Sequence, residues 1–148
     1  MAKFQYRMQN ILDIKEKLEG QEKINFSIAM QHLNEEQEAL QKLMIRRASY
    51  ERDLKELSLG SLNIADINSC KKSIDSMKRL IRDQMMNVKK AQRDVDIARA
   101  RLNSVMQERK MHENLKEKDF EEFKEELAAA ESKITDELVS YTYHEKDE

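Results

Sequence analysis

The sequence contains no proline, no tryptophan, two glycines and one cysteine among its 148 residues. Proline breaks helix interiors and glycine weakens them, so little in this chain interrupts long helices. Two glycines cannot form the glycine-rich loops that bind nucleotide phosphates. A lone cysteine, Cys70, allows no internal disulfide and is typical of a reducing compartment. These absences exclude the common nucleotide-binding loops and a disulfide-stabilised fold.

Long apolar runs are missing as well. Short ones occur at 43–45 and 127–130, whereas a membrane-spanning helix needs about 20 apolar residues. The first eight residues lack the hydrophobic region of a secretory signal. We therefore expect a cytoplasmic protein without direct membrane insertion.

Charged residues are abundant, at 38% of the chain against about 25% in ordinary domains. Their signs are unevenly spread, with a net charge of −1 over 1–70, +7 over 71–112 and −8 over 113–148. This pattern has two readings. It is an ordinary solvated helix surface, or it is a basic middle and an acidic end that bind different partners.

A heptad pattern covers most of the chain, because apolar residues recur at alternating steps of three and four. In the second half the row is Ile67, Cys70, Ile74, Met77, Ile81, Gln84, Val88, Ala91, Val95, Ala98, Leu102 and Val105. In the first half it is Phe26, Ala29, Leu33, Glu36, Leu40, Leu43, Arg47, Tyr50, Leu54 and Leu57. Such rows indicate a coiled coil.

The helical pattern is clearly interrupted between the two rows. Gly60 is expected to take a left-handed conformation after the first helix, and Asn63 is expected to cap the second, with Asp66 in its first turn. A short loop makes the two helices antiparallel neighbours. Opposed residues should then have numbers that add up to about 121, which places Leu40 against Ile81. The predicted fold is all-α, two long helices in an antiparallel coiled-coil hairpin.

We expect one domain over 1–148, with a helix over about 4–58, a loop over about 59–63, a longer helix over about 64–140 and a disordered acidic tail over 141–148. Phe4 should lie opposite about residue 117. The second helix should therefore extend beyond its partner and present an apolar stripe. Its members are Phe120, Phe123, Leu127, Ala130, Ile134, Leu138 and Tyr141.

The sequence offers no pattern of catalytic or metal-binding residues. His32, His112 and His144 do not have metal-ligand spacing, and a pair of helices provides no desolvated pocket for catalysis. Cys70 is interpreted as a small residue between the helices. We expect no enzymatic activity, no cofactor and no bound metal.

Several segments resemble the flagellar FliJ family. They are the opening Phe4-Gln5-Tyr6-Arg7-Met8-Gln9-Asn10-Ile11-Leu12 with Lys15 and Glu16, the Gly60-Ser61 loop, Met106-Gln107-Glu108-Arg109-Lys110 and Lys118-Asp119-Phe120-Glu121-Glu122-Phe123. The resemblance covers nearly the whole length, and the order of the segments agrees with it. It implies a hairpin similar to the stalk of the rotary ATPase γ subunit, in the flagellar type III protein export apparatus at the cytoplasmic side of the cell membrane.

The resemblance also implies partners. The end of the hairpin with both termini should bind the hexameric export ATPase, through Phe4, Met8, Ile11, Phe120, Phe123, Leu127, Ile134 and Leu138. The part near the loop should bind the cytoplasmic domain of the membrane export gate, through Leu43, Tyr50, Met77, Leu80 and Gln84. Four of these five gate residues also belong to the heptad rows, so Leu80 is the clearest exposed member. Export chaperones are further expected partners.

Two other readings stay open. The chain could be the equivalent stalk of a virulence-type secretion system or of a rotary ATPase. It could also be a generic coiled-coil arm that binds nucleic acid through its basic middle, although it lacks the interleaved aromatics that single strands favour. We expect no nucleic-acid partner.

Overall fold

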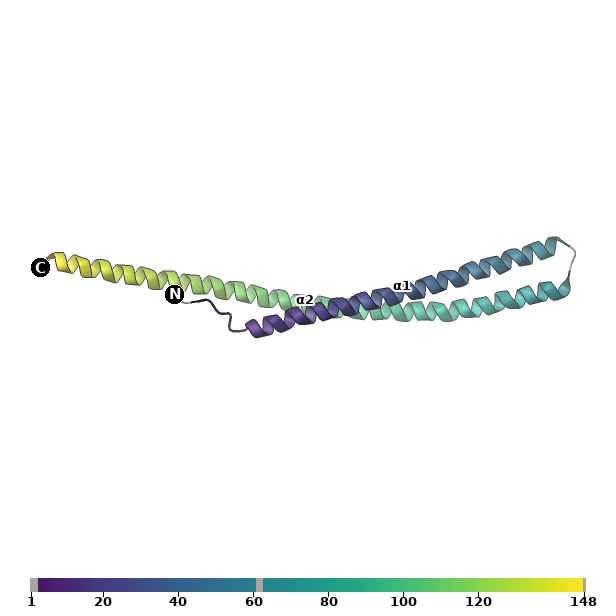
Figure 1. Cartoon of the computed structure of the whole chain (residues 1–148), viewed down its shortest axis with the longest axis horizontal. Helices are drawn as coiled ribbons and strands as arrows, with labels where there is room; N and C mark the ends of the chain where they lie inside the picture. Colours follow the sequence, from purple (N-terminus) through teal and green to yellow (C-terminus); the bar gives the residue numbers. More distant parts are fainter. Residues whose placement is uncertain (1–2, 61–62, 148) are drawn as a thin grey trace. The chain divides into compact units, whose positions relative to one another are not determined.

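The computed structural model describes residues 3–60 and 63–147, and these residues form two helices (Figure 1). The helix α1 spans Gln9–Leu59, and the helix α2 spans Ile64–Asp147. No strand occurs in the described ranges. The predicted all-α helical hairpin is confirmed.

The start of α2 follows the prediction, whereas Gly60 does not. The Asn63 side-chain oxygen accepts hydrogen bonds from the backbone N–H of Ala65 (3.1 Å) and of Asp66 (3.4 Å). Asn63 is thus a helix cap, and the carboxylate of Asp66 lies in the first turn, where the helix dipole favours a negative charge. Gly60 does not have a positive φ. The prediction of a left-handed conformation at Gly60 is therefore wrong. The helix α1 ends at Leu59 without a left-handed residue after it.

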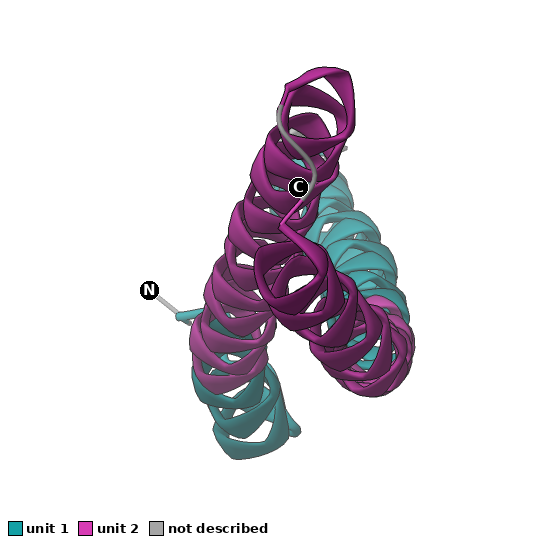
Figure 2. Ribbon diagram, turned by 90° about the vertical axis from the view of Figure 1, so that its right-hand side faces the viewer, with its two compact units in different colours: residues 1–20, 104–148 teal, residues 21–103 magenta. Residues whose placement is uncertain are grey.

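The chain divides into two compact units (Figure 2). Unit 1 contains Met1–Gly20 and Ser104–Glu148, and unit 2 contains Gln21–Asn103. Each unit includes a part of α1 and a part of α2. The prediction of a single domain stays a prediction.

The core of unit 2 is formed by the predicted heptad rows. Leu33, Ala91 and Val95 are buried together, and Phe26 and Val88 pack against them. All heptad residues that fall in unit 2 are buried or half-buried. A seam of this kind stabilises the pair of helices mainly by removing apolar surface from water.

Two polar contacts in unit 2 establish the register of its helices. The Gln84 side-chain amide donates a hydrogen bond to the backbone carbonyl of Glu36 (2.9 Å) and another to the Glu36 carboxylate. The Cys70 thiol donates to the backbone carbonyl of Tyr50 (3.1 Å). Both pairs have numbers that add up to 120. The predicted antiparallel register is therefore confirmed in this unit.

In unit 1 the chain enters α1 through a non-helical segment. α1 begins at Gln9, not near residue 4 as predicted, and the Gln9 N–H donates to the Tyr6 carbonyl (3.1 Å). A non-helical residue can advance by up to about 3.5 Å, against 1.5 Å in a helix. Phe4 therefore reaches farther along α2 than expected and contacts Phe120 and Phe123. Phe4 also lines a hollow with Lys116 and Glu117, so it lies only slightly beyond the position predicted opposite about residue 117.

The last part of α2 also differs from the prediction. The helix continues to Asp147, whereas a disordered tail was expected from residue 141. The Thr142 hydroxyl donates to the Leu138 carbonyl one turn earlier (2.9 Å), so this polar side chain bonds within the helix. No proline or glycine occurs after Gly60 to end it. Residue 148 lies outside the described residues.

Candidate interaction surfaces

The residues predicted to bind the export gate lie in unit 2 but differ in exposure. Met77 is buried, Leu43, Tyr50 and Gln84 are half-buried, and Leu80 is 45% exposed. Gln84 and Tyr50 already take part in the contacts that establish the register. Met77 cannot reach a partner without a change in packing. The surface available for binding at this position is therefore centred on Leu80.

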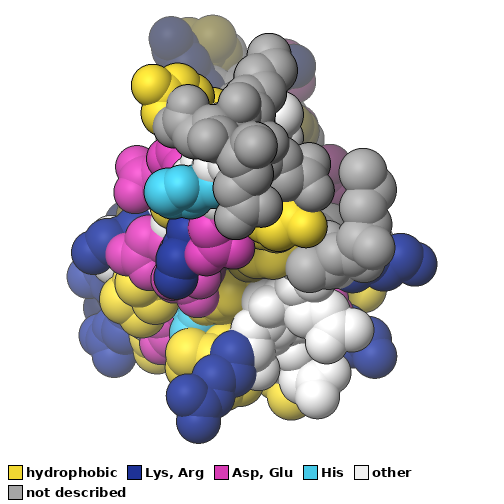
Figure 3. All heavy atoms as spheres, turned by 90° about the vertical axis from the view of Figure 1, so that its left-hand side faces the viewer, with side chains coloured by type: hydrophobic (Ala, Val, Ile, Leu, Met, Phe, Trp, Pro, Cys, Tyr) yellow, Lys and Arg dark blue, Asp and Glu magenta, His cyan; other side chains and the backbone are white. Residues whose placement is uncertain are grey.

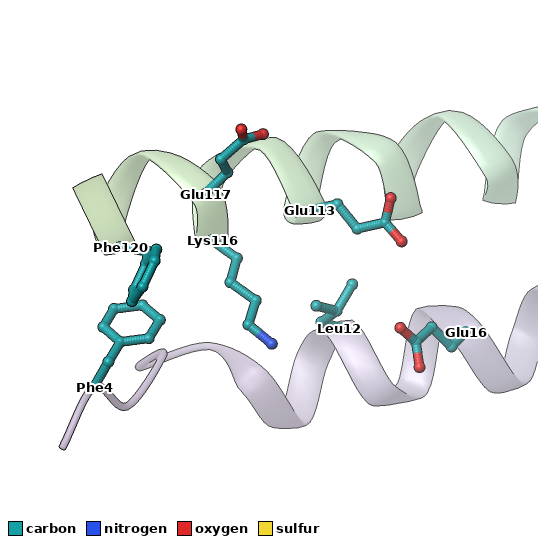
Figure 4. A pocket seen from close by; sticks show the side chains of 7 residues that line it. All are labelled: Phe4, Leu12, Glu16, Glu113, Lys116, Glu117 and Phe120. Atoms are coloured by element: carbon teal, nitrogen blue, oxygen red, sulfur yellow. The ribbon is translucent and has the colours of Figure 1, made fainter. Parts of the chain in front are cut away.

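The aromatic residues of unit 1 form a cluster of three rings. The Phe4 ring centroid lies 5.0 Å from that of Phe120 in an edge-to-face arrangement and 5.5 Å from that of Phe123. Such pairs contribute about 0.5–1.5 kcal/mol beyond their buried area. Figure 4 shows the Phe4 and Phe120 rings facing each other across the gap between the N-terminal segment and α2. The cluster attaches this segment to the helix.

A hollow lies beside this cluster within unit 1 (Figure 4). It is lined by Phe4, Leu12, Glu16, Glu113, Lys116, Glu117 and Phe120. In the figure, the ammonium group of Lys116 points toward the N-terminal segment, and Leu12 lies between the two helices. Leu12 is only 3% exposed. Apolar and charged groups alternate here, which suits contact with a protein surface better than binding of a small apolar ligand.

Charged residues near the core of unit 1 form a network of ion pairs. Arg109 pairs with the buried Glu19 and, at 2.8 Å, with Glu113. Hydrogen bonding to Glu113, opposed in part by burial, raises the pKa of the Arg109 guanidinium, and Glu19 adds to this rise. The Lys15 ammonium lies 2.6 Å from the Glu108 carboxylate. This network joins the two helices of unit 1.

The remaining ring-binding candidates fall into two groups. Met8, which directly precedes α1, and Ile11, in its first turn, are each 39% exposed. In α2, every side chain from residue 124 to residue 144 is exposed, including Leu127, Ile134 and Leu138. These three residues lie on one face of the helix, because their spacing is seven and four. Figure 3 shows hydrophobic and acidic side chains next to each other on the face turned to the viewer.

Sequence reasoning missed four residues of unit 1 that the structure brings together. Tyr6 and Leu12 are buried, and Arg109 pairs with the buried Glu19. Glu19 and Arg109 both lie outside the two heptad rows, so the periodic pattern does not mark them. His112 is buried too.

In residues 3–60 and 63–147 no group of three or more His, Cys, Asp or Glu side chains could hold a metal ion. None of the described helical stretches is both long and apolar enough to cross a membrane.

The chain matches the model of a known protein family. The model of the family described as "Flagellar FliJ protein" matches residues 4–148. No curated protein and no solved structure matches the chain. The family is one of non-enzymatic flagellar proteins, and the match supports a role related to flagellar export.

Proposed function

The chain belongs to the flagellar FliJ protein family, and from this premise we propose that it is a non-enzymatic stalk of the flagellar type III protein export apparatus. In this role it binds the export ATPase ring, the cytoplasmic domain of the membrane export gate and export chaperones. Its place is the cytoplasmic side of the membrane at the flagellar base. It uses no cofactor, because its task is to connect proteins.

The observation that carries the proposal is the exposed apolar face of α2 beyond Phe123. Leu127, Ile134 and Leu138 are 38%, 57% and 62% exposed. Burying one such side chain contributes about 1.5–3 kcal/mol before ordering costs. An apolar face that is left exposed in this way suits docking into another protein.

Residues near the N-terminus contribute to the same docking surface. Phe4 contacts Phe120 and Phe123, and Met8 and Ile11 of the same unit are partly exposed. We assign this combined surface of unit 1 to the export ATPase ring.

The gate-binding surface is assigned to Leu80 and its half-buried neighbours in unit 2. Leu43, Tyr50 and Gln84 each expose part of their side chain, and the buried Met77 supports them. An exposed leucine one helical turn from the half-buried Gln84 suits a small, transient protein contact.

The deciding experiment truncates the chain after Lys124, which keeps Phe120 and Phe123 for contact with Phe4. The truncated chain should stay helical and should no longer promote assembly or ATP hydrolysis by the export ATPase. A second variant, Leu127→Ser with Ile134→Ser and Leu138→Ser, should have the same effect at full length. A normal response of the ATPase to both variants would overturn the proposal.

The matched control is Val139→Ser with Tyr143→Ser. Both side chains are exposed, at 63% and 68%, on the same part of α2. They point away from the stripe, because a helix turns by about 100° per residue. The control should stimulate the ATPase normally. A loss equal to that of the stripe variant would mean that apolar content alone, and not this face, is required.

A further inference from the structure

A basic surface in unit 2 remains unexplained by the contacts within the chain. We call it the basic–methionine face, and it consists of Lys78, Arg79, Arg82, Met85, Met86 and Lys89 on α2. All six residues are exposed, and they line two adjoining hollows. Asp75 and Asp83 are the acidic residues at these hollows. Among the described residues, none of the four cations of the face forms an ion pair.

The chemistry of this face defines the kind of partner that fits it. Four unpaired cations favour an acidic surface, since their charge is not neutralised within the unit. Met85 and Met86 are 43% and 59% exposed, and methionine adapts its flexible side chain to irregular apolar surfaces. A helix that carries acidic and large apolar side chains together satisfies both requirements.

Such a helix is present in the chain itself. Residues 120–144 contain seven acidic and two basic residues, and they also carry the apolar stripe around Leu127 and Ile134. From residue 124 onward their side chains are exposed. By contrast, residues 71–93 contain eight basic and two acidic residues. The two segments are therefore opposite in charge, and both have apolar groups without a partner.

The acidic segment and the basic–methionine face both belong to α2, which is helical from Ile64 to Asp147. We propose that the basic–methionine face binds the acidic segment 120–144 of a second copy of this chain. The contact brings glutamates of one copy to the lysines and arginines of the other, and it covers Met85 and Met86 with the apolar stripe.

This self-association has a consequence for the role in export, although it does not depend on that role. The apolar stripe is also the surface that we assign to the ATPase ring. One copy cannot use the stripe for both contacts at once. Self-association therefore covers the stripe in chains that are not bound to the ring.

The test measures the oligomeric state of the full chain by sedimentation velocity, without any partner protein. At about 0.05 M salt the chain should sediment as a dimer or larger species, in a concentration-dependent manner. At about 1 M salt, where the screening length is only about 3 Å, it should sediment as a monomer. A monomer at low salt, or an oligomer that salt does not dissociate, would overturn the proposal.

Two charge-reversal variants test the residues. The basic-face variant carries Lys78→Glu, Arg82→Glu and Lys89→Glu, and the acidic variant carries Glu125→Lys, Glu126→Lys and Glu131→Lys. Each should weaken self-association by about tenfold or more, since several ion pairs become repulsive together. A mixture of the two variants should associate again, because each supplies a surface complementary to the other. Failure of the mixture to associate would contradict the assigned pairing.

The matched control reverses three exposed cations of α1, with Lys42→Glu, Arg52→Glu and Lys55→Glu. It changes the net charge by the same amount as the basic-face variant does. It should self-associate as the unchanged chain does. Circular dichroism should show full helix content for all three variants. Binding of the monomer to anionic lipid vesicles or to DNA through the basic face, without self-association, would assign the face to that ligand and overturn the proposal.

Discussion

Gln84 and Glu36, which lie 48 positions apart in the chain, form a polar contact within the seam of unit 2. Gln84 donates one hydrogen bond to the Glu36 backbone and another to its carboxylate. A polar pair at a heptad position favours one register, because any shift of the helices breaks the hydrogen bonds between its members. The contact therefore contributes specificity to an otherwise apolar seam.

Replacing Gln84 by alanine should lower the free energy of unfolding by about 1–3 kcal/mol, because the half-buried Glu36 carboxylate loses its donor. Urea unfolding followed by circular dichroism measures the change. The control is Gln92→Ala, since Gln92 is exposed and bonds only Asp96 on its own helix; it should stay within about 0.5 kcal/mol of the unchanged chain. Equal unfolding curves for both variants would show that the contact contributes nothing.

Ile81 and Leu80 are neighbours in α2 with opposite environments, at 5% and 45% exposure. Ile81→Asp places a charge in the seam and should lower stability by several kcal/mol, about 3–5 by analogy with other buried charges. Leu80→Asp should change it by less than about 1 kcal/mol. Thermal unfolding of the two variants compares them directly. Similar melting temperatures would contradict the register.

Leu80→Asp also tests the gate-binding surface. Because Leu80 is exposed, the variant should keep its helix content. It should bind the cytoplasmic domain of the export gate at least about tenfold more weakly, which is the loss expected for one anchoring apolar side chain. Isothermal titration with that domain gives the affinity. The control is Ile97→Asp, which alters an equally exposed apolar residue of α2 outside the proposed surface. Unchanged affinity for Leu80→Asp would place the gate contact elsewhere.

Phe4→Ala should release the N-terminal segment from α2 in unit 1. The substitution removes both ring contacts, each contributing about 0.5–1.5 kcal/mol. Hydrogen exchange should then become faster at the amides of Gln9 and Leu12, whose hydrogen bonds belong to the start of α1. The exposed neighbour Gln5, replaced by alanine, is the control. Unchanged exchange would mean that Phe4 does not hold this segment.

The hairpin and its register could be predicted from the sequence because a heptad row repeats the same requirement many times. A single polar residue in the row, such as Glu36, does not hide the pattern, because the row members before and after it are apolar. The cap at Asn63 was predictable too, since its side chain bonds amides only two and three residues away. Features that depend on local contacts or on repeated patterns can therefore be predicted from the sequence.

The start of α1 and the end of α2 were not predictable in the same way. Phe4 lies outside the helix because of its contact with Phe120, which depends on residues more than a hundred positions apart. The acidic composition of residues 141–147 suggested disorder, but nothing there breaks a helix. Among the candidate sites, periodicity separated Leu80 from the seam, but it gave no indication of the pair formed by Glu19 and Arg109.

The contacts of unit 2 also indicate the order in which its two helices pair during folding. Tyr50 and Cys70 are separated by 20 positions, whereas Glu36 and Gln84 are separated by 48. The entropy lost in closing a loop increases with its length, so the pair nearer the turn closes first. Each closed pair then shortens the loop that the next pair must close, and the unit gains its core layer by layer from the turn outward. During synthesis, the first helix therefore leaves the ribosome with its apolar face uncovered until the second helix follows it.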